Sequence, residues 1–177
     1  MRDITVSKAL LWVFIAEILS IFSGQGVIGS IIGIVAFVLN LVALYGASKH
    51  EQGYHTAVIL SIVGTVVSVV GAIVGESTVM ASIVSIISAV VGLAILYFVV
   101  ITTCNILEAN GDSDVAQKGY TVWKLNLILT IVTVVLLVLS LISVVLAGIL
   151  AIVMLIVGLV ASILYLVFLW KSHKALA

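Results

Sequence analysis

Long apolar runs alternate with short polar interruptions along the whole chain. A bilayer core about 30 Å thick requires roughly 20 apolar residues in a helix that rises about 1.5 Å per residue. Six runs approach or exceed this length: residues 9–24, 26–47, 55–75, 78–104, 125–146 and 148–170. The pattern predicts an all-α, polytopic transmembrane helix bundle that occupies residues 1–177 as a single transmembrane domain.

The boundary between the last two spans is the least distinct. Residues 125–170 form one apolar stretch, which as a single helix would be about 69 Å long and too long for one crossing. Glycine favours turns, so Ala147-Gly148 is the natural place for a break.

The connections between the spans alternate in charge. Those between spans one and two, three and four, and five and six carry no basic residue. All seven basic residues lie on the other side of the membrane: Arg2, Lys8, Lys49, Lys118, Lys124, Lys171 and Lys174. The positive-inside bias makes that side cytoplasmic. We therefore expect three antiparallel hairpins, cytoplasmic N- and C-termini, and a longest cytoplasmic loop at residues 105–122.

The tryptophans indicate the same boundary. Trp12, Trp123 and Trp170 each lie within four residues of a lysine, as amphipathic rings do at headgroup depth. Arg2 and Lys8 ahead of an apolar run also fit a signal peptide, but Glu17 interrupts its apolar core.

Composition narrows the class of protein further. Apolar residues make up 64% of the chain and charged residues 8%, against about 25% charged in a soluble domain. The formal net charge is zero, which removes the positive field that nucleic-acid binding needs. We expect lipid as the main partner and an integral, multi-pass protein of a bacterial cytoplasmic membrane.

The sequence offers little for catalysis or cofactor chemistry. His50 and His55 flank Glu51 with a spacing one residue too long for a zinc-binding HExxH helix. Cys104 has no His/Asp arrangement at its depth, and residues 110–114 lack the full calcium-loop pattern. We predict no enzyme activity, no cofactor, no metal and a packed thiol at Cys104.

Small residues recur at four-residue spacing within the spans. In lipid, helices associate through such residues because they allow close backbone approach. Such a row of small residues can form an oligomer interface, line a permeation path or pack helices within one bundle. The predicted packing positions are Gly29, Gly33, Gly64, Ser68, Ala72 and Ser85.

Glu17 is the only ionisable residue well inside a span. It lies nine residues beyond Lys8, about 13 Å below the inner boundary at helical rise. Its apolar neighbours favour insertion by roughly 3–5 kcal/mol, and a central acid opposes it by about 2.5–3.5 kcal/mol. We expect a carboxyl that is protonated or hydrogen-bonded to neutral groups. It is a candidate proton carrier or ligand for a cationic solute, or a packing residue.

Three further polar residues lie at depths comparable with Glu17. Asn40 is expected on the adjoining antiparallel helix, and Thr65 and Thr133 supply further hydroxyls. With Glu17 they form the predicted binding or permeation set.

Two functions remain open from these residues. The first is a transport-type protein, either a solute-binding or translocating subunit or an oligomeric channel, with Glu17 in a polar path. The second is an accessory membrane protein that organises a membrane or cytoplasmic partner, or copies of itself. The size and span count resemble the substrate-binding subunits of energy-coupling-factor vitamin importers, which implies a solute-binding role; the solute or cation is unknown.

Overall fold

The computed structural model describes residues 4–24, 26–74, 78–140 and 144–177. Six α-helices and no strand occur in these ranges: α1 (Ile4–Ile21), α2 (Val27–Ser48), α3 (Gln52–Val74), α4 (Thr78–Ala109), α5 (Ser113–Ser140) and α6 (Val144–Leu176). The five helices α2–α6 are long and apolar enough to cross a membrane. The predicted all-α, multi-pass bundle is therefore confirmed.

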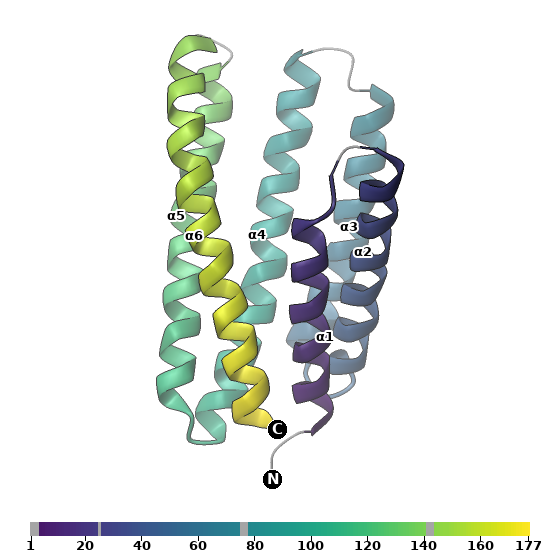
Figure 1. The fold of residues 1–177 in the computed structure, drawn as a ribbon, viewed down its shortest axis with the longest axis vertical. Helices are drawn as coiled ribbons and strands as arrows, with labels where there is room; N and C mark the ends of the chain where they lie inside the picture. Colours follow the sequence, from purple (N-terminus) through teal and green to yellow (C-terminus); the bar gives the residue numbers. More distant parts are fainter. Residues whose placement is uncertain (1–3, 25, 75–77, 141–143) are drawn as a thin grey trace.

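The helices form a ring in chain order (Figure 1). Each helix packs against the helices before and after it in the sequence, and α6 packs against α1 to close the ring. Successive helices run in opposite directions, so the ring consists of the hairpins α1/α2, α3/α4 and α5/α6 (Figure 1). Both termini consequently lie at the same end of the bundle.

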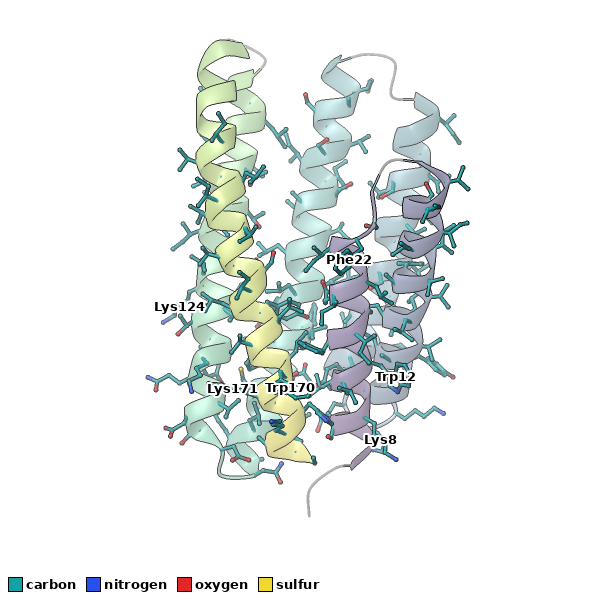
Figure 2. All side chains as sticks on the ribbon, viewed as in Figure 1. Lys8, Trp12, Phe22, Lys124, Trp170 and Lys171 are labelled. Carbon is teal, nitrogen blue, oxygen red and sulfur yellow. The ribbon has the colours of Figure 1, made fainter. Side chains whose placement is uncertain are left out.

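We call the end that holds both termini the basic end. Lys8 and Lys171 lie there, and Lys124 lies in the same half of the bundle (Figure 2). A cross-helix contact joins the two terminal helices at this end. Ser7 Oγ donates to the carbonyl oxygen of His173 at 2.9 Å, and Nδ1 of His173 donates to the carbonyl oxygen of Ser7 at 2.9 Å.

The tightly packed core also lies in this half. Its largest buried side chains come from five of the six helices: Val6, Leu10, Val13, Leu44, Tyr54, Val99, Val100, Leu107, Phe168 and Leu169. Inside it, the Tyr54 hydroxyl and Thr103 Oγ1 form a hydrogen bond of 2.8 Å between α3 and α4. Burial of these side chains seals the basic end of the ring.

The connection between α4 and α5 is much shorter than the expected loop at residues 105–122. α4 continues to Ala109 and α5 begins at Ser113. Gly111 has φ +87°, and the amides of Gly111 and Asp112 donate to the carbonyls of Glu108 and Leu107, a pattern that ends a helix with a left-handed residue. Polar composition had indicated a loop, but charged residues are equally compatible with helices that extend beyond the lipid.

The break between the last two helices also differs from the expectation. α5 ends at Ser140 and α6 begins at Val144, so Ala147-Gly148 lies inside α6. A glycine costs only about 1 kcal/mol in a helix interior, which is too little to force a turn by itself. The expected connection between spans three and four, residues 76–77, lies outside the described residues.

Candidate functional site

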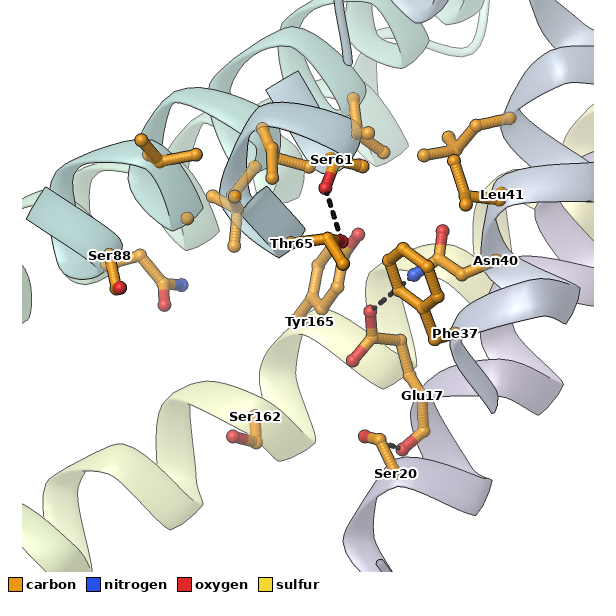
Figure 3. Close-up of a pocket in the computed structure, with 18 of the residues that line it drawn as sticks. Glu17, Ser20, Phe37, Asn40, Leu41, Ser61, Thr65, Ser88, Ser162 and Tyr165 are labelled. Carbon is orange, nitrogen blue, oxygen red and sulfur yellow. Dashed lines mark hydrogen bonds between the residues drawn. The ribbon is translucent and has the colours of Figure 1, made fainter. Parts of the chain in front are cut away.

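The ring of helices surrounds a partly open cavity of about 620 Å³, which we call the chamber. All six helices contribute to its wall, and α1 ends at its level because Ser20 and Ile21 line it. The polar lining residues are Glu17, Ser20, Asn40, Ser61, Thr65, Ser68, Ser88, Asn126, Ser162 and Tyr165. Figure 3 shows several of these side chains pointing toward one another from different helices.

Glu17 and Asn40 form the one side-chain pair between helices that the structure gives at the chamber wall. Asn40 Nδ2 donates to Glu17 Oε1 at 3.3 Å, across the α1/α2 hairpin (Figure 3). The other amide atom, Asn40 Oδ1, is buried and has no hydrogen-bond partner within the described part of the chain. A buried acceptor without a donor costs roughly 1–3 kcal/mol, so a donor that reaches Asn40 Oδ1 from the chamber would be stabilising.

Several hydroxyl groups of the wall bond to their own helices. Thr65 Oγ1 donates to the carbonyl of Ser61 at 2.9 Å, and Ser68 Oγ donates to the carbonyl of Gly64 at 3.0 Å. Ser162 does the same toward Gly158 at 3.0 Å. These side chains can occupy a membrane interior because their donors are satisfied locally.

The floor of the chamber is apolar and faces the basic end. Leu44 and Val99 line the chamber and are themselves buried in the core, with exposed fractions of 2% each. The core beyond them closes the ring. The chamber is thus separated from the basic end by packed side chains and forms no continuous path through the described bundle.

The structure brings Glu17, Asn40 and Thr65 together around the chamber, from three different helices. Thr133 is not among the lining residues, and its hydroxyl donates to the carbonyl of Leu129 at 2.9 Å. That these residues bind a solute stays a prediction.

The small residues predicted for packing take different positions. A Cβ on Gly29 would contact the backbone of Gly24, and one on Gly33 would lie 3.3 Å from Ser23 Cβ, so both glycines hold the α1–α2 connection close to α2. Gly64 and Ser68 line the chamber, and a Cβ on Gly64 would lie 3.3 Å from a Val91 methyl.

The other two predicted packing positions take no described part in the chamber. Ser85 is exposed and donates to the carbonyl of Ala81 at 2.8 Å, and the side chain of Ala72 lies outside the described residues.

Sequence reasoning missed two prominent members of the wall. Asn126 on α5 is partly buried and donates to the carbonyl of Val122 at 2.9 Å. A polar amide well inside the fifth helix was a signal for it. Tyr165 follows a leucine, like Tyr45 and Tyr97, and no local signal distinguishes the tyrosine that lines the chamber.

No metal site is indicated among the described side chains, where no group of three or more His, Cys, Asp and Glu residues comes together. Cys104 is buried, and its thiol donates to the carbonyl of Ala116 at 3.3 Å. Comparisons of the chain with protein-family models, with curated proteins and with solved structures found no match. The resemblance to importer subunits therefore remains one of size and span count.

Proposed function

We propose that the chain is a transport-type membrane protein whose helix ring forms a solute-binding chamber, and that it is not an enzyme. The observation that carries the proposal is the chamber itself, a cavity of about 620 Å³ with the Glu17–Asn40 pair in its wall. Small-molecule sites are typically cavities of about 300–1,000 Å³ with a few converging polar groups. Lipid alone gives no reason for polar side chains from several helices to converge on a cavity inside a bundle.

The closed basic end favours a binding subunit over an open channel. Leu44, Val99 and the core behind them separate the chamber from that end. The lysines around the termini support an orientation in which the basic end faces the cytoplasm of a bacterial cell. A solute would then reach the chamber from the opposite side or from the membrane.

The proposal is tested by the access of water-soluble reagents to the chamber. Cys104 is the only cysteine, so a Cys104→Ala background allows single cysteines to be placed at will. Ser68→Cys lies in the chamber wall, and Val69→Cys, the next residue of α3, replaces a side chain that is 53% exposed on the bundle. In proteoliposomes, a charged methanethiosulfonate reagent should modify Ser68→Cys at least about tenfold faster, because thiolate forms in water and not in lipid.

Equal, slow modification of both cysteines would contradict the proposal. The chamber would then be a sealed helix contact, and the second function, an accessory protein that organises a partner complex, would be favoured. A third variant, Trp170→Cys, controls for reagent activity, because this position is 39% exposed near the basic end.

A further inference from the structure

Five hydroxyl groups around the chamber, those of Ser20, Ser61, Thr65, Ser68 and Ser162, donate their proton to a backbone carbonyl of their own helix. The hydroxyls of Ser61, Thr65 and Ser68 on α3 each donate their proton to a backbone carbonyl one turn earlier, at 2.8–3.0 Å. A hydroxyl that gives its proton to the helix keeps lone pairs that can accept a hydrogen bond. The α3 side of the chamber therefore presents acceptors.

The Glu17–Asn40 pair also presents hydrogen-bond acceptors to the chamber. Asn40 uses an amide proton on Glu17 Oε1, which leaves Asn40 Oδ1 buried without a donor and the second carboxyl oxygen of Glu17 free of any bond the structure gives. A ligand with several N–H groups would satisfy both oxygens after a small rotation of the amide. A ligand that offers only acceptors would leave them unpaired, at a cost of binding.

The charge of the wall has one sign. Glu17 is the only Asp, Glu, Lys, Arg or His among the described residues that line the chamber. An ionised carboxyl at this depth is stable only with a cation beside it, and no lysine is among the described residues that line the chamber. The rings of Phe37 and Tyr165 flank the carboxyl (Figure 3), and aromatic faces attract cations.

The size and apolar lining of the chamber identify the kind of cation. A bare metal ion needs six or more oxygens at about 2.0–2.6 Å, whereas the chamber has a volume of about 620 Å³. Much of its wall is hydrocarbon, including Leu41, Ile95 and Leu96. Such a wall fits an organic cation with an apolar substituent.

We propose that the chamber binds a small protonated amine, an inference that rests on the proposed function. The ammonium group donates to the carboxylate of Glu17 and to Asn40 Oδ1, with a third N–H directed to a hydroxyl of α3. The apolar substituent packs against the hydrocarbon wall. Glu17 is ionised in the complex. Where its carboxyl carries a proton in the empty chamber, binding of the protonated amine releases that proton to water.

The test uses four probes that share one phenylethyl group and differ in the polar end: 2-phenylethylamine, its N,N,N-trimethyl derivative, 2-phenylethanol and 3-phenylpropionate. Binding to the full-length protein in lipid nanodiscs is measured by calorimetry, with empty nanodiscs subtracted. We expect saturable binding of 2-phenylethylamine, at least about tenfold weaker binding of the trimethyl cation, which lacks N–H donors, and no binding of the alcohol or the acid.

Variants locate the site. Glu17→Gln and Asn40→Leu should each weaken binding of the amine by about tenfold or more, since each removes one partner of a charge-assisted or buried hydrogen bond. Thr133→Val is the matched control, because Thr133 lies outside the chamber wall. If either chamber variant fails to fold, selectivity among the four probes on the wild-type protein still decides the matter.

Saturable, Glu17-dependent binding of the alcohol or the acid in place of the amine would overturn the amine assignment and leave the binding chamber intact. Tighter binding of the trimethyl cation than of the amine would overturn the role given to Asn40 Oδ1 and the N–H groups. Absence of binding of all four probes would overturn the amine assignment. Slow modification of Ser68→Cys in the same preparation would overturn the proposed function as well.

Discussion

Most serine and threonine side chains of the bundle bond to their own helix, and only a few polar groups connect two helices. Tyr54 and Thr103 make such a connection at 2.8 Å inside the core, and Thr103 Oγ1 also donates to the carbonyl of Val99. Cross-helix hydrogen bonds contribute about 0.6–2 kcal/mol in membrane proteins. Each such hydrogen bond therefore sets the relative position of two helices and adds little to the free energy of unfolding of the whole bundle.

Tyr54→Phe should lower the free energy of unfolding by about 1 kcal/mol, since it removes the hydroxyl that bonds to Thr103 and preserves the ring. Unfolding in mixed detergent–SDS micelles measures the change. Tyr45→Phe is the matched control, because Tyr45 is 59% exposed, whereas Tyr54 is 0% exposed. An equal effect of the two substitutions would show that the buried hydrogen bond contributes nothing specific.

Glu17→Leu should promote insertion of the first helix by about 3–4 kcal/mol, taking the insertion cost of aspartate for glutamate and the gain for leucine. The fraction of the α1 segment that inserts into microsomes, read by glycosylation of engineered sites, measures the effect. Ile18→Leu exchanges two residues of similar insertion energy and should leave the fraction unchanged. If Glu17→Leu inserted no better than wild type, Glu17 would not lie at mid-membrane depth.

Only some of the residues that line the chamber could be predicted from the sequence alone. Glu17 and Asn40 could be identified because an acid and an amide are conspicuous in apolar spans. Thr65 and Thr133 are alike in sequence, yet only Thr65 lines the chamber. Which face of a helix looks inward depends on the neighbours it packs against, and these spans are apolar on all sides.

Helix pairs approach closely where a glycine faces a bulky side chain. A Cβ on Gly119 of α5 would lie 2.6–2.8 Å from ring carbons of Phe168 on α6, and would contact the sulfur of Cys104 on α4. Gly119 thus allows three helices to meet near the basic end. Gly119 is not part of a four-residue spacing of small residues within a span, so that pattern does not predict its role.

Gly119→Ala should destabilise the protein by about 1–3 kcal/mol, because the ring of Phe168 has to move out of a packed core. Gly46→Ala is the control, since nothing lies within 4 Å of a Cβ at that position and alanine favours helix. Thermal unfolding in detergent should show a lower midpoint for the first variant only. Equal midpoints would mean that the three helices do not pack as closely as described.

The pairing of the first and last helices is a second element-scale feature. Ser7→Ala removes the hydrogen bonds that Ser7 Oγ makes with His173, and it should cost about 1 kcal/mol. Ser172→Ala removes an equally buried hydroxyl that bonds within α6, to the carbonyl of Phe168. Chemical unfolding should rank Ser7→Ala as the less stable variant, and the reverse order would exclude a role for this contact in closing the ring.

In the whole molecule, contact between α1 and α6 closes the ring around the chamber. The packed core closes the chamber at the basic end only. Both termini, Lys8 and Lys171 lie at the sealed end. A bundle with this polarity has a defined orientation if the basic end is retained in the cytoplasm.

Single cysteines at Lys49 and Lys174, in the Cys104→Ala background, should react with an impermeant maleimide only when inverted vesicles expose the cytoplasmic face. The same reagent should instead modify Ser68→Cys from the outer face of intact cells. Modification of Lys49→Cys and Lys174→Cys from different compartments would contradict the even number of crossings, and modification of both from outside would reverse the orientation.

The sequence by itself determined that the protein resides in lipid, how many helices it has and that its basic residues lie toward one end. These properties follow from the length of apolar runs and the position of charges, which are local. Only the tertiary structure decided that the helices close into a ring and that Asn126 and Tyr165 join Glu17 around a chamber. It also decided that α4 continues to Ala109 and α5 begins at Ser113, with a short turn between them. Apolar residues occur on all sides of these helices, so the rotation of each helix and the choice of its partners are set by close packing between helices, which a linear pattern does not encode.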